Sequence, residues 1–433
     1  MTTRRDFLHG ALGALAVPVL PGFRADAVRR LERATERGGL PDGPGDPADE
    51  SYWAEVRRAF DLDDTLVNLN NGGVCPAPMP VLEAMIRDLR FSNVLPVEHM
   101  WRLLQPRMES VRRELAREFG CDPEEIAVVR NASEAMETLI LGLELRRGDE
   151  VVVTTQNYPR MLTAWDQRVR RDGIVLRRVT FAVPPRDPRE IADRVLAAVT
   201  PRTRAIELPH ITNLTGQILP ITEIVRRARE RGIPVFVDGA HAFAHFPFGR
   251  DALGCDFYGT SLHKWLLAPI GTGFLHVRRA RIGDIWPLMA APASMDRDIR
   301  KFEEIGTHPQ ANFNAIAVAL SFHRGIGAER KAARLRWLRD RWARALAAAS
   351  DRVRIRTPLD DPAQAGAIGF FSVDGMNHAK LGSWLHDKWR IVSTPIVMDE
   401  FDGVRVTPNV YTSARECDLL VEAVTQAIRT GAV

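Results

Sequence analysis

The chain has 433 residues, of which 45% are hydrophobic and 26% charged, a globular balance with enough length for a large core and two domains. Its 59 basic and 55 acidic residues leave a net charge of +4, and the basic residues are scattered along helical segments, which argues against a nucleic-acid-binding protein. The four cysteines lie far apart without a C-x-x-C pair, so neither a disulfide framework nor a zinc site is indicated.

The N-terminus reads "TRRDFLHGALGALAVPVLPG", an arginine pair followed by a short apolar run that contains two prolines. The run is too short to span a bilayer and has the pattern of a twin-arginine signal. We therefore expect residues 1–27 to be a signal peptide read by the twin-arginine export machinery, and the mature protein to be periplasmic or extracellular. The alternative is an amphipathic or disordered N-terminus. No later stretch has the pattern of a membrane helix.

Residues 28–67 are charged and then rich in Gly and Pro, which indicates a helical piece and a linker. Over 68–310, amphipathic helical periodicity alternates with short Val- and Ile-rich runs, which predicts a large α/β domain with a mostly parallel sheet covered by helices. The expected helices are 79–91, 98–119, 133–145, 160–171, 188–199 and 221–231, and the expected strands are 150–155, 174–179, 204–209, 234–239, 257–261 and 271–277.

Residues 311–433 have a different pattern, which predicts a smaller C-terminal α+β domain. Two long helices come first, and short strands then alternate with helices. The expected helices are 312–324, 327–349, 377–388 and 413–430, and the expected strands are 353–357, 367–373 and 403–407.

The stretch "SLHKWLLAPIGTG" at 261–273 places Lys264 among apolar neighbours, where burying an ammonium costs several kcal/mol unless it is paired or neutral. Only five residues of the chain are lysines, so 54 of its 59 basic residues are arginines. Arginine stays protonated, whereas a lysine amine can lose its proton and attack a carbonyl. Lys264 is therefore a candidate for chemistry.

Polar residues follow several of the expected strands, at the sheet edge where ligands bind in open α/β folds. Each has an ordinary explanation when taken alone: a helix cap for Asn131-Ala132-Ser133, packing for Tyr158, and a turn for Asn213 or Asp238. Their shared edge favours a single site. This set comprises Ala132, Ser133, Tyr158, Asn213, Asp238, His241, Ser261, His263 and Lys264.

His241 and His245 are four residues apart, a spacing that also suits a metal site on one helical face. The segment lacks the Glu of H-E-x-x-H and an obvious third ligand, so we expect no metal.

One cofactor uses all these features together. Pyridoxal phosphate needs a lysine amine to form an imine, a carboxylate to keep its ring nitrogen protonated, and an anion cradle for its phosphate. An imine would also leave Lys264 neutral, which resolves the cost of burying it.

The motifs "HITNLTG", "VDGAHA", "SLHKW", "GTGFL" and "EEIGTHP" occur in order, with Asp238 26 residues before Lys264. Over 68–277 and 302–412 the chain resembles the class V aminotransferase family of fold-type I pyridoxal-phosphate enzymes, close to its isopenicillin N epimerase-like and cysteine desulfurase-like branches. The resemblance implies that Lys264 is the Schiff-base lysine and proton shuttle and that Asp238 is the partner of the pyridine nitrogen. Asn213 and His241 would lie near the phenolic oxygen or ring, with His241 where many relatives have glutamine.

The resemblance also implies a phosphate site, a ring-stacking group and a substrate site. Tyr158 takes the place of a histidine that often stacks on the ring in this family, and Arg405 matches the arginine that binds the substrate carboxylate. Thr307 matches a threonine lent to a neighbour's phosphate site, which implies a homodimer with shared active sites. The phosphate would be held by Ala132, Ser133, Ser261 and His263.

The implied activity is that of an enzyme acting at the Cα of an amino-acid or peptide-like substrate through a Lys264 imine, like an isopenicillin N epimerase. Aminotransferase and C–S or β-elimination lyase activities are the alternatives, and a non-catalytic pyridoxal-phosphate-binding protein is a further one. Persulfide-forming desulfuration is disfavoured because residues 385–404 contain no cysteine.

Overall fold

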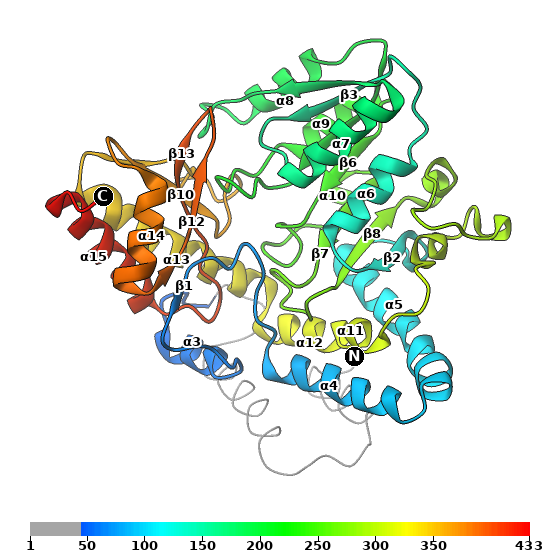
Figure 1. Cartoon of the computed structure of the whole chain (residues 1–433), viewed down its shortest axis with the longest axis horizontal. Coiled ribbons are helices and arrows are strands. Elements are labelled where there is room, and N and C mark those ends of the chain that lie inside the picture. Colours follow the sequence, from blue (N-terminus) through cyan, green and yellow to red (C-terminus); the bar gives the residue numbers. More distant parts are fainter. Residues whose placement is uncertain (1–44) are drawn as a thin grey trace.

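The computed structural model describes residues 45–433, so the expected signal peptide at 1–27 lies outside the described residues. The described chain forms a large α/β layer structure and a smaller α+β region beside it (Figure 1). No helix among residues 45–433 is both long enough and apolar enough to cross a membrane.

The main sheet has seven strands in the order β2-β8-β7-β6-β5-β3-β4, all parallel except β8, which is antiparallel to both neighbours. Most of these strands are buried on both faces, which explains their Val- and Ile-rich sequences. The mostly parallel sheet predicted from the sequence is thus confirmed. Its strands are β2 (Ile126–Val129), β3 (Glu150–Thr154), β4 (Val175–Val179), β5 (Thr203–Pro209), β6 (Val235–Asp238), β7 (Phe257–Ser261) and β8 (Gly273–Val277).

Helices cover the sheet on both faces, each over its own apolar core. Against one face lie α6 (Ala132–Gly142) and α7 (Pro159–Asp172). The other face is covered by α4 (Met79–Val94), α5 (Met108–Phe119), α8 (Arg189–Ala197), α9 (Ile221–Arg229), α11 (Gln310–Asn314) and α12 (Ile316–Ile326). Short helical segments make up the connections: η3 (Pro123–Glu125), α10 (Arg250–Leu253), η4 (Arg279–Asp284), η5 (Ala293–Met295) and η6 (Ile299–Glu303).

The single helix expected over 98–119 is wrong in one respect. The segment begins as a π-helix, η1 (Val97–Leu104), passes through a 3₁₀ turn, η2 (Gln105–Arg107), and becomes α-helical only in α5. Pro106 lacks a backbone N–H and crowds the turn before it, so a regular α-helix is interrupted there.

The C-terminal region contains a four-stranded antiparallel sheet in the order β12-β13-β10-β9. Three helices, α13 (Ala328–Ala349), α14 (His378–Trp389) and α15 (Ala414–Thr430), share an apolar core with it. The strands are β9 (Val353–Ile355), β10 (Gly369–Val373), β12 (Thr394–Val397) and β13 (Asp402–Val406).

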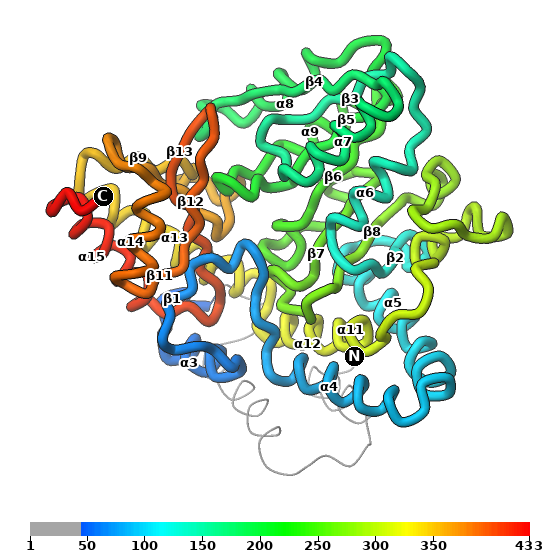
Figure 2. The backbone as a smooth tube through the Cα atoms, viewed as in Figure 1, coloured from blue at the N-terminus to red at the C-terminus, as the bar shows by residue number. Residues whose placement is uncertain are grey.

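The first described segment joins this C-terminal region. β1 (Val67–Asn68) pairs in parallel with β11 (Ile391–Val392), and the two strands run side by side in Figure 2. Before it, α3 (Glu50–Arg57) is tied to the same region because Arg57 donates a hydrogen bond to the Tyr411 carbonyl at 2.7 Å. Segments more than 300 residues apart in sequence are thereby brought together.

Candidate active site

A cavity of about 530 Å³ opens at the carboxyl ends of β5, β6 and β7, beside the N-terminus of α6. The structure brings nine of the eleven predicted site residues to its wall. They are Ala132, Ser133, Tyr158, Asn213, Asp238, His241, Ser261, His263 and Lys264. Their common location follows from the topology, because parallel strands end at the same edge of a sheet.

Lys264 lies in the loop after β7, and its Nζ is 2.9 Å from Nε2 of His241. Burial, with a smaller contribution from the Arg405 charge, lowers the pKa of Lys264 to about 8, although the Asp238 carboxylate opposes the shift. The amine is therefore partly neutral near pH 7 to 8, as a nucleophile toward a carbonyl must be. Lys264 is thus a half-buried lysine with a lowered pKa.

Asp238 is the last residue of β6 and is only 6% exposed. One carboxylate oxygen accepts a hydrogen bond from the backbone N–H of Ala240 at 2.9 Å. Burial raises the pKa of Asp238, an effect that the Ala240 N–H and the Lys264 charge partly offset. A buried carboxylate favours a positive charge beside it, so Asp238 would stabilise the protonated ring nitrogen of a cofactor bound here.

The N-terminus of α6 lies at the cavity wall with two hydroxyl groups beside it. Asn131 caps the helix by accepting from the Glu134 N–H, and the Ser261 hydroxyl oxygen accepts from the Ala132 N–H at 2.9 Å. The Ser261 proton thus remains able to donate, beside the helix-terminal residue Ser133. Burial lowers the pKa of His263 to about 4, so its ring is neutral at physiological pH. Hydroxyls and a helix N-terminus together suit a phosphate.

Arg405 on β13 is not part of the cavity wall, but it binds a residue that is. Its guanidinium donates to the carbonyl of Asn213 at 2.7 Å and to Oδ1 of Asn70 at 2.9 Å, while Thr394 accepts a longer bond at 3.3 Å. Its Nε is buried without a hydrogen-bond partner. The planar fork of a guanidinium held in place in this way is suited to a carboxylate.

Tyr158 and Thr307 have different surroundings. Tyr158 is the N-cap residue before α7 and remains 40% exposed on the cavity wall, which leaves its ring accessible to a ligand. Thr307 lies on an exposed loop between η6 and α11 and does not line the cavity of its own chain. The role in a neighbour's site that the resemblance implies for Thr307 remains a prediction.

The histidine pair considered as a metal site is engaged elsewhere. Nδ1 of His245 bonds the His241 carbonyl at 2.7 Å, and its Nε2 accepts from the Ala367 N–H at 2.6 Å. Both ring nitrogens of His245 are thus used within the protein, so this pair is not a ligand set.

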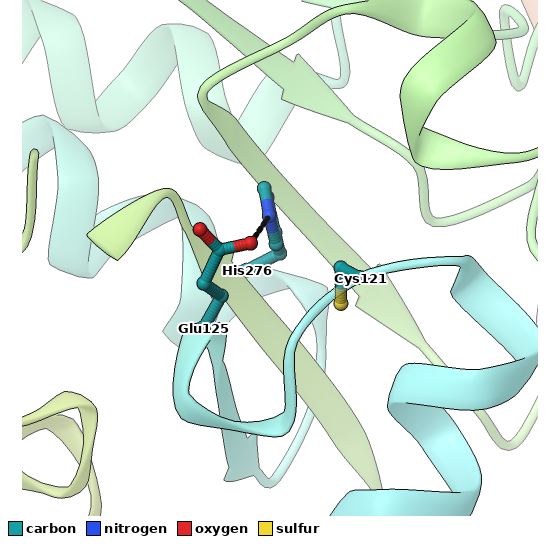
Figure 3. Close-up of side chains that lie close together, drawn as sticks. All are labelled: Cys121, Glu125 and His276. Atoms are coloured by element: carbon teal, nitrogen blue, oxygen red, sulfur yellow. Dashed lines mark hydrogen bonds and ion pairs between the residues drawn. The ribbon is translucent and has the colours of Figure 1, made fainter. Parts of the chain in front are cut away.

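One cluster in residues 45–433 has metal-ligand chemistry: Cys121, Glu125 and His276, away from the cavity (Figure 3). Glu125 already faces His276 at 3.4 Å, accepts from the Arg279 N–H at 2.9 Å, and lies 3.6 Å from the Arg250 guanidinium. A carboxylate beside an arginine is a poor partner for a divalent cation, because the two positive charges repel.

Several residues around the site did not emerge from the sequence. Arg130, Glu137 and Arg160 also line the cavity, and Asn70 and Thr394 hold Arg405. Lys331 was detectable: it is another of the five lysines, it is fully buried in α13, and it donates to the Trp265 carbonyl next to Lys264.

The sheet architecture and the placement of Lys264 at its edge make the chain a fold-type I pyridoxal-phosphate-dependent enzyme. Residues 67–394 match the model of the class-V aminotransferases, and the chain belongs to this family.

Two similar proteins are isopenicillin N epimerases. That of Streptomyces clavuligerus is 32% identical over 86% of this chain and 97% of its own, and that of Amycolatopsis lactamdurans is 32% identical with the same coverages. Among solved structures, a mutant of C-DES with glycine covalently linked to its pyridoxal-phosphate cofactor superposes with a TM-score of 0.74 at 23% identity, covering 85% of this chain and 98% of that one. The expected family and fold are confirmed.

Proposed function

We propose that this enzyme is an epimerase that removes and returns the Cα proton of an amino-acid or peptide-like substrate bearing a free α-amino group. One observation carries the proposal: the Lys264 amine, with its pKa lowered to about 8, lies against the His241 ring in a cavity that also contains the buried Asp238. The similarity to two isopenicillin N epimerases over 86% of the chain supports this reaction over the others open to the family.

The described residues fit pyridoxal phosphate. Ser133, Ser261 and His263, with the N-terminus of α6, would hold its phosphate, and Asp238 would keep its ring nitrogen protonated. Ala132 contributes by bonding Ser261 rather than by facing the anion with its N–H. When bound, the cofactor spreads the electron pair left at Cα over its ring, which makes the Cα proton acidic.

Lys264 and His241 would handle the proton. The Lys264 amine is the base in reach of the cavity, and the His241 Nε2 beside it can share a hydrogen bond with that amine. Tyr158 would cover the ring from the cavity wall, and Asn213 would lie near the phenolic oxygen. Arg405 would bind the substrate carboxylate through its guanidinium, which its bonds to Asn213 and Asn70 orient.

The test is incubation of the cofactor-loaded enzyme with pooled amino acids and short peptides in deuterated water. Deuterium at Cα together with inverted configuration supports the epimerase. Oxo-acid that depends on an added acceptor would identify an aminotransferase instead, and released sulfide or ammonia would identify a lyase. Lys264→Ala is the control, since it should lose the enzyme-dependent exchange and leave only the background. If no substrate were turned over, the result would support the non-catalytic cofactor-binding protein.

We also propose that two copies of the chain form a homodimer in which each lends Thr307 to the other's phosphate site. Exposed apolar side chains gather on α4, the following loop and η1, as a subunit interface requires: Val94, Leu95, Val97 and Trp101. Thr307→Ala should then weaken cofactor retention in the dimer, measured by equilibrium dialysis. A fully active monomer in analytical ultracentrifugation would contradict the shared site.

Export by the twin-arginine route is likewise proposed, on the sequence of residues 1–27 alone. Replacing the two arginines of the leader by lysines should retain the protein inside cells, as followed by fractionation. Unchanged export of that variant would argue against this route.

A further inference from the structure

His241 has two polar neighbours, one at each ring nitrogen. Nε2 lies 2.9 Å from the Lys264 amine, and the indole N–H of Trp265 points to Nδ1 at 3.4 Å. An indole nitrogen can only donate, so the ring nitrogen that it faces carries the lone pair when the Lys264 nitrogen is neutral and accepts from Nε2–H. Burial lowers the pKa of His241 well below its ordinary value, with the Lys264 charge adding to the effect, so the ring holds one proton.

Trp265 is fixed in the orientation that this contact needs. Its ring is fully buried and stacks on that of His245, with centroids 3.7 Å apart and an interplanar angle of 12°. Its backbone is held as well, because the buried Lys331 ammonium or amine donates to the Trp265 carbonyl. The indole therefore has little freedom to turn its N–H away from His241.

His245 is itself locked in one tautomer. Because its Nε2 accepts from the Ala367 N–H, its proton is on Nδ1, and it donates to the His241 carbonyl. The close approach depends on Gly366, where an added Cβ would come within 2.4 Å of the His245 ring. His245 thus holds both the backbone of His241 and the plane of Trp265.

We propose that Trp265 and His245 are positioning residues that fix His241 in the tautomer with its proton on Nε2, so that His241 presents an N–H donor to the reacting centre beside Lys264. With the proton on Nδ1 instead, two N–H groups would oppose each other at Trp265, and Nε2 would offer a lone pair. Toward the cofactor, Nε2 of His241 would donate a hydrogen bond in the first tautomer and accept one in the second. Only the catalytic use of the Nε2–H donor rests on the proposed function; the tautomer of His241 does not.

The experiment is nitrogen NMR of the full chain, labelled in its histidine rings and loaded with pyridoxal phosphate. The His241 signals are assigned by their loss in His241→Gln. We expect Nε2 to be protonated and Nδ1 to be unprotonated in the wild-type protein. In Trp265→Phe, which keeps a ring against His245 but removes the donor, we expect the tautomer ratio to shift by roughly fivefold toward Nδ1–H, the equivalent of about 1 kcal/mol for one hydrogen bond.

Trp342→Phe is the matched control, because Trp342 is equally buried and its indole N–H has no hydrogen-bond partner. It should leave the His241 signals unchanged. A proton on Nδ1 in the wild-type protein overturns the proposal directly, even if Trp265→Phe fails to fold, and so does an unchanged ratio in a folded Trp265→Phe. The spectra are recorded without substrate, so they test the tautomer of His241 even if the protein proves to have no epimerase activity.

Discussion

The lowered pKa of Lys264 has a kinetic consequence, because only the neutral amine can become covalently attached to pyridoxal phosphate. With the pKa at about 8, roughly 10% of the amine is neutral at pH 7, whereas a lysine of pKa near 10.4 would be about 0.04% neutral, a difference of roughly 200-fold. Attachment to the cofactor-free enzyme should therefore rise tenfold per pH unit below about pH 8 and then level off.

The assay is stopped-flow mixing of cofactor-free enzyme with pyridoxal phosphate from pH 6 to 10, following the visible absorbance band. Borohydride trapping and peptide mapping must recover the label on Lys264. Two variants should move the midpoint in opposite directions: Asp238→Asn lowers it by removing a stabilising negative charge, and Arg405→Gln raises it by removing a like charge. A rate that keeps rising tenfold per unit from pH 8 to 10 in the wild-type enzyme would refute the reasoning.

Three further predictions concern the site and its support. Asp238→Asn should lower turnover by roughly 100-fold or more while retaining bound cofactor, because a ring nitrogen without its carboxylate is a poorer electron sink; near-normal turnover would count against this role. Arg405→Lys should raise KM by roughly tenfold with less effect on kcat, since a lysine keeps the charge but not the two-pronged fork; an unchanged KM would remove Arg405 from the substrate site. Burial lowers the pKa of Lys331 to about 7, so the Lys331 side chain binds its proton more tightly in the unfolded chain than in the folded one. Lys331→Met removes this titrating group. The wild-type free energy of unfolding, from urea titrations, should therefore rise by about 1.4 kcal/mol per pH unit between pH 7 and 9 relative to the variant. Lys380→Met, at an exposed lysine, should show no such difference, and parallel wild-type and Lys331→Met curves would contradict the lowered pKa.

The alternation of elements and the cavity wall could be predicted because both depend on local sequence. Val- and Ile-rich runs mark buried parallel strands, and chain order then places Asn213, Asp238 and Lys264 at one sheet edge. The scarcity of lysine singled out Lys264 on chemical grounds.

Other parts of the site depend on contacts that no local pattern encodes. Asn70 and Thr394 hold Arg405 although 324 residues separate them, and the pairing of β1 with β11 is too short to register in a periodicity. The π-helix of η1 arises where Pro106 interrupts an otherwise regular helical pattern. Lys331 carried the same compositional signal as Lys264, but its contact with Trp265 is visible only in three dimensions.

The pairing of the first described segment with the C-terminal region limits how far the polypeptide can be shortened for expression or crystallisation. Asp49 caps α3, and Asn70 both follows β1 and bonds Arg405. Trimming that stops before Asp49 preserves these contacts, whereas cutting to residue 70 would remove a strand partner and one anchor of the guanidinium together. Such a shortened enzyme should lose discrimination for its substrate carboxylate even if its main sheet still assembles.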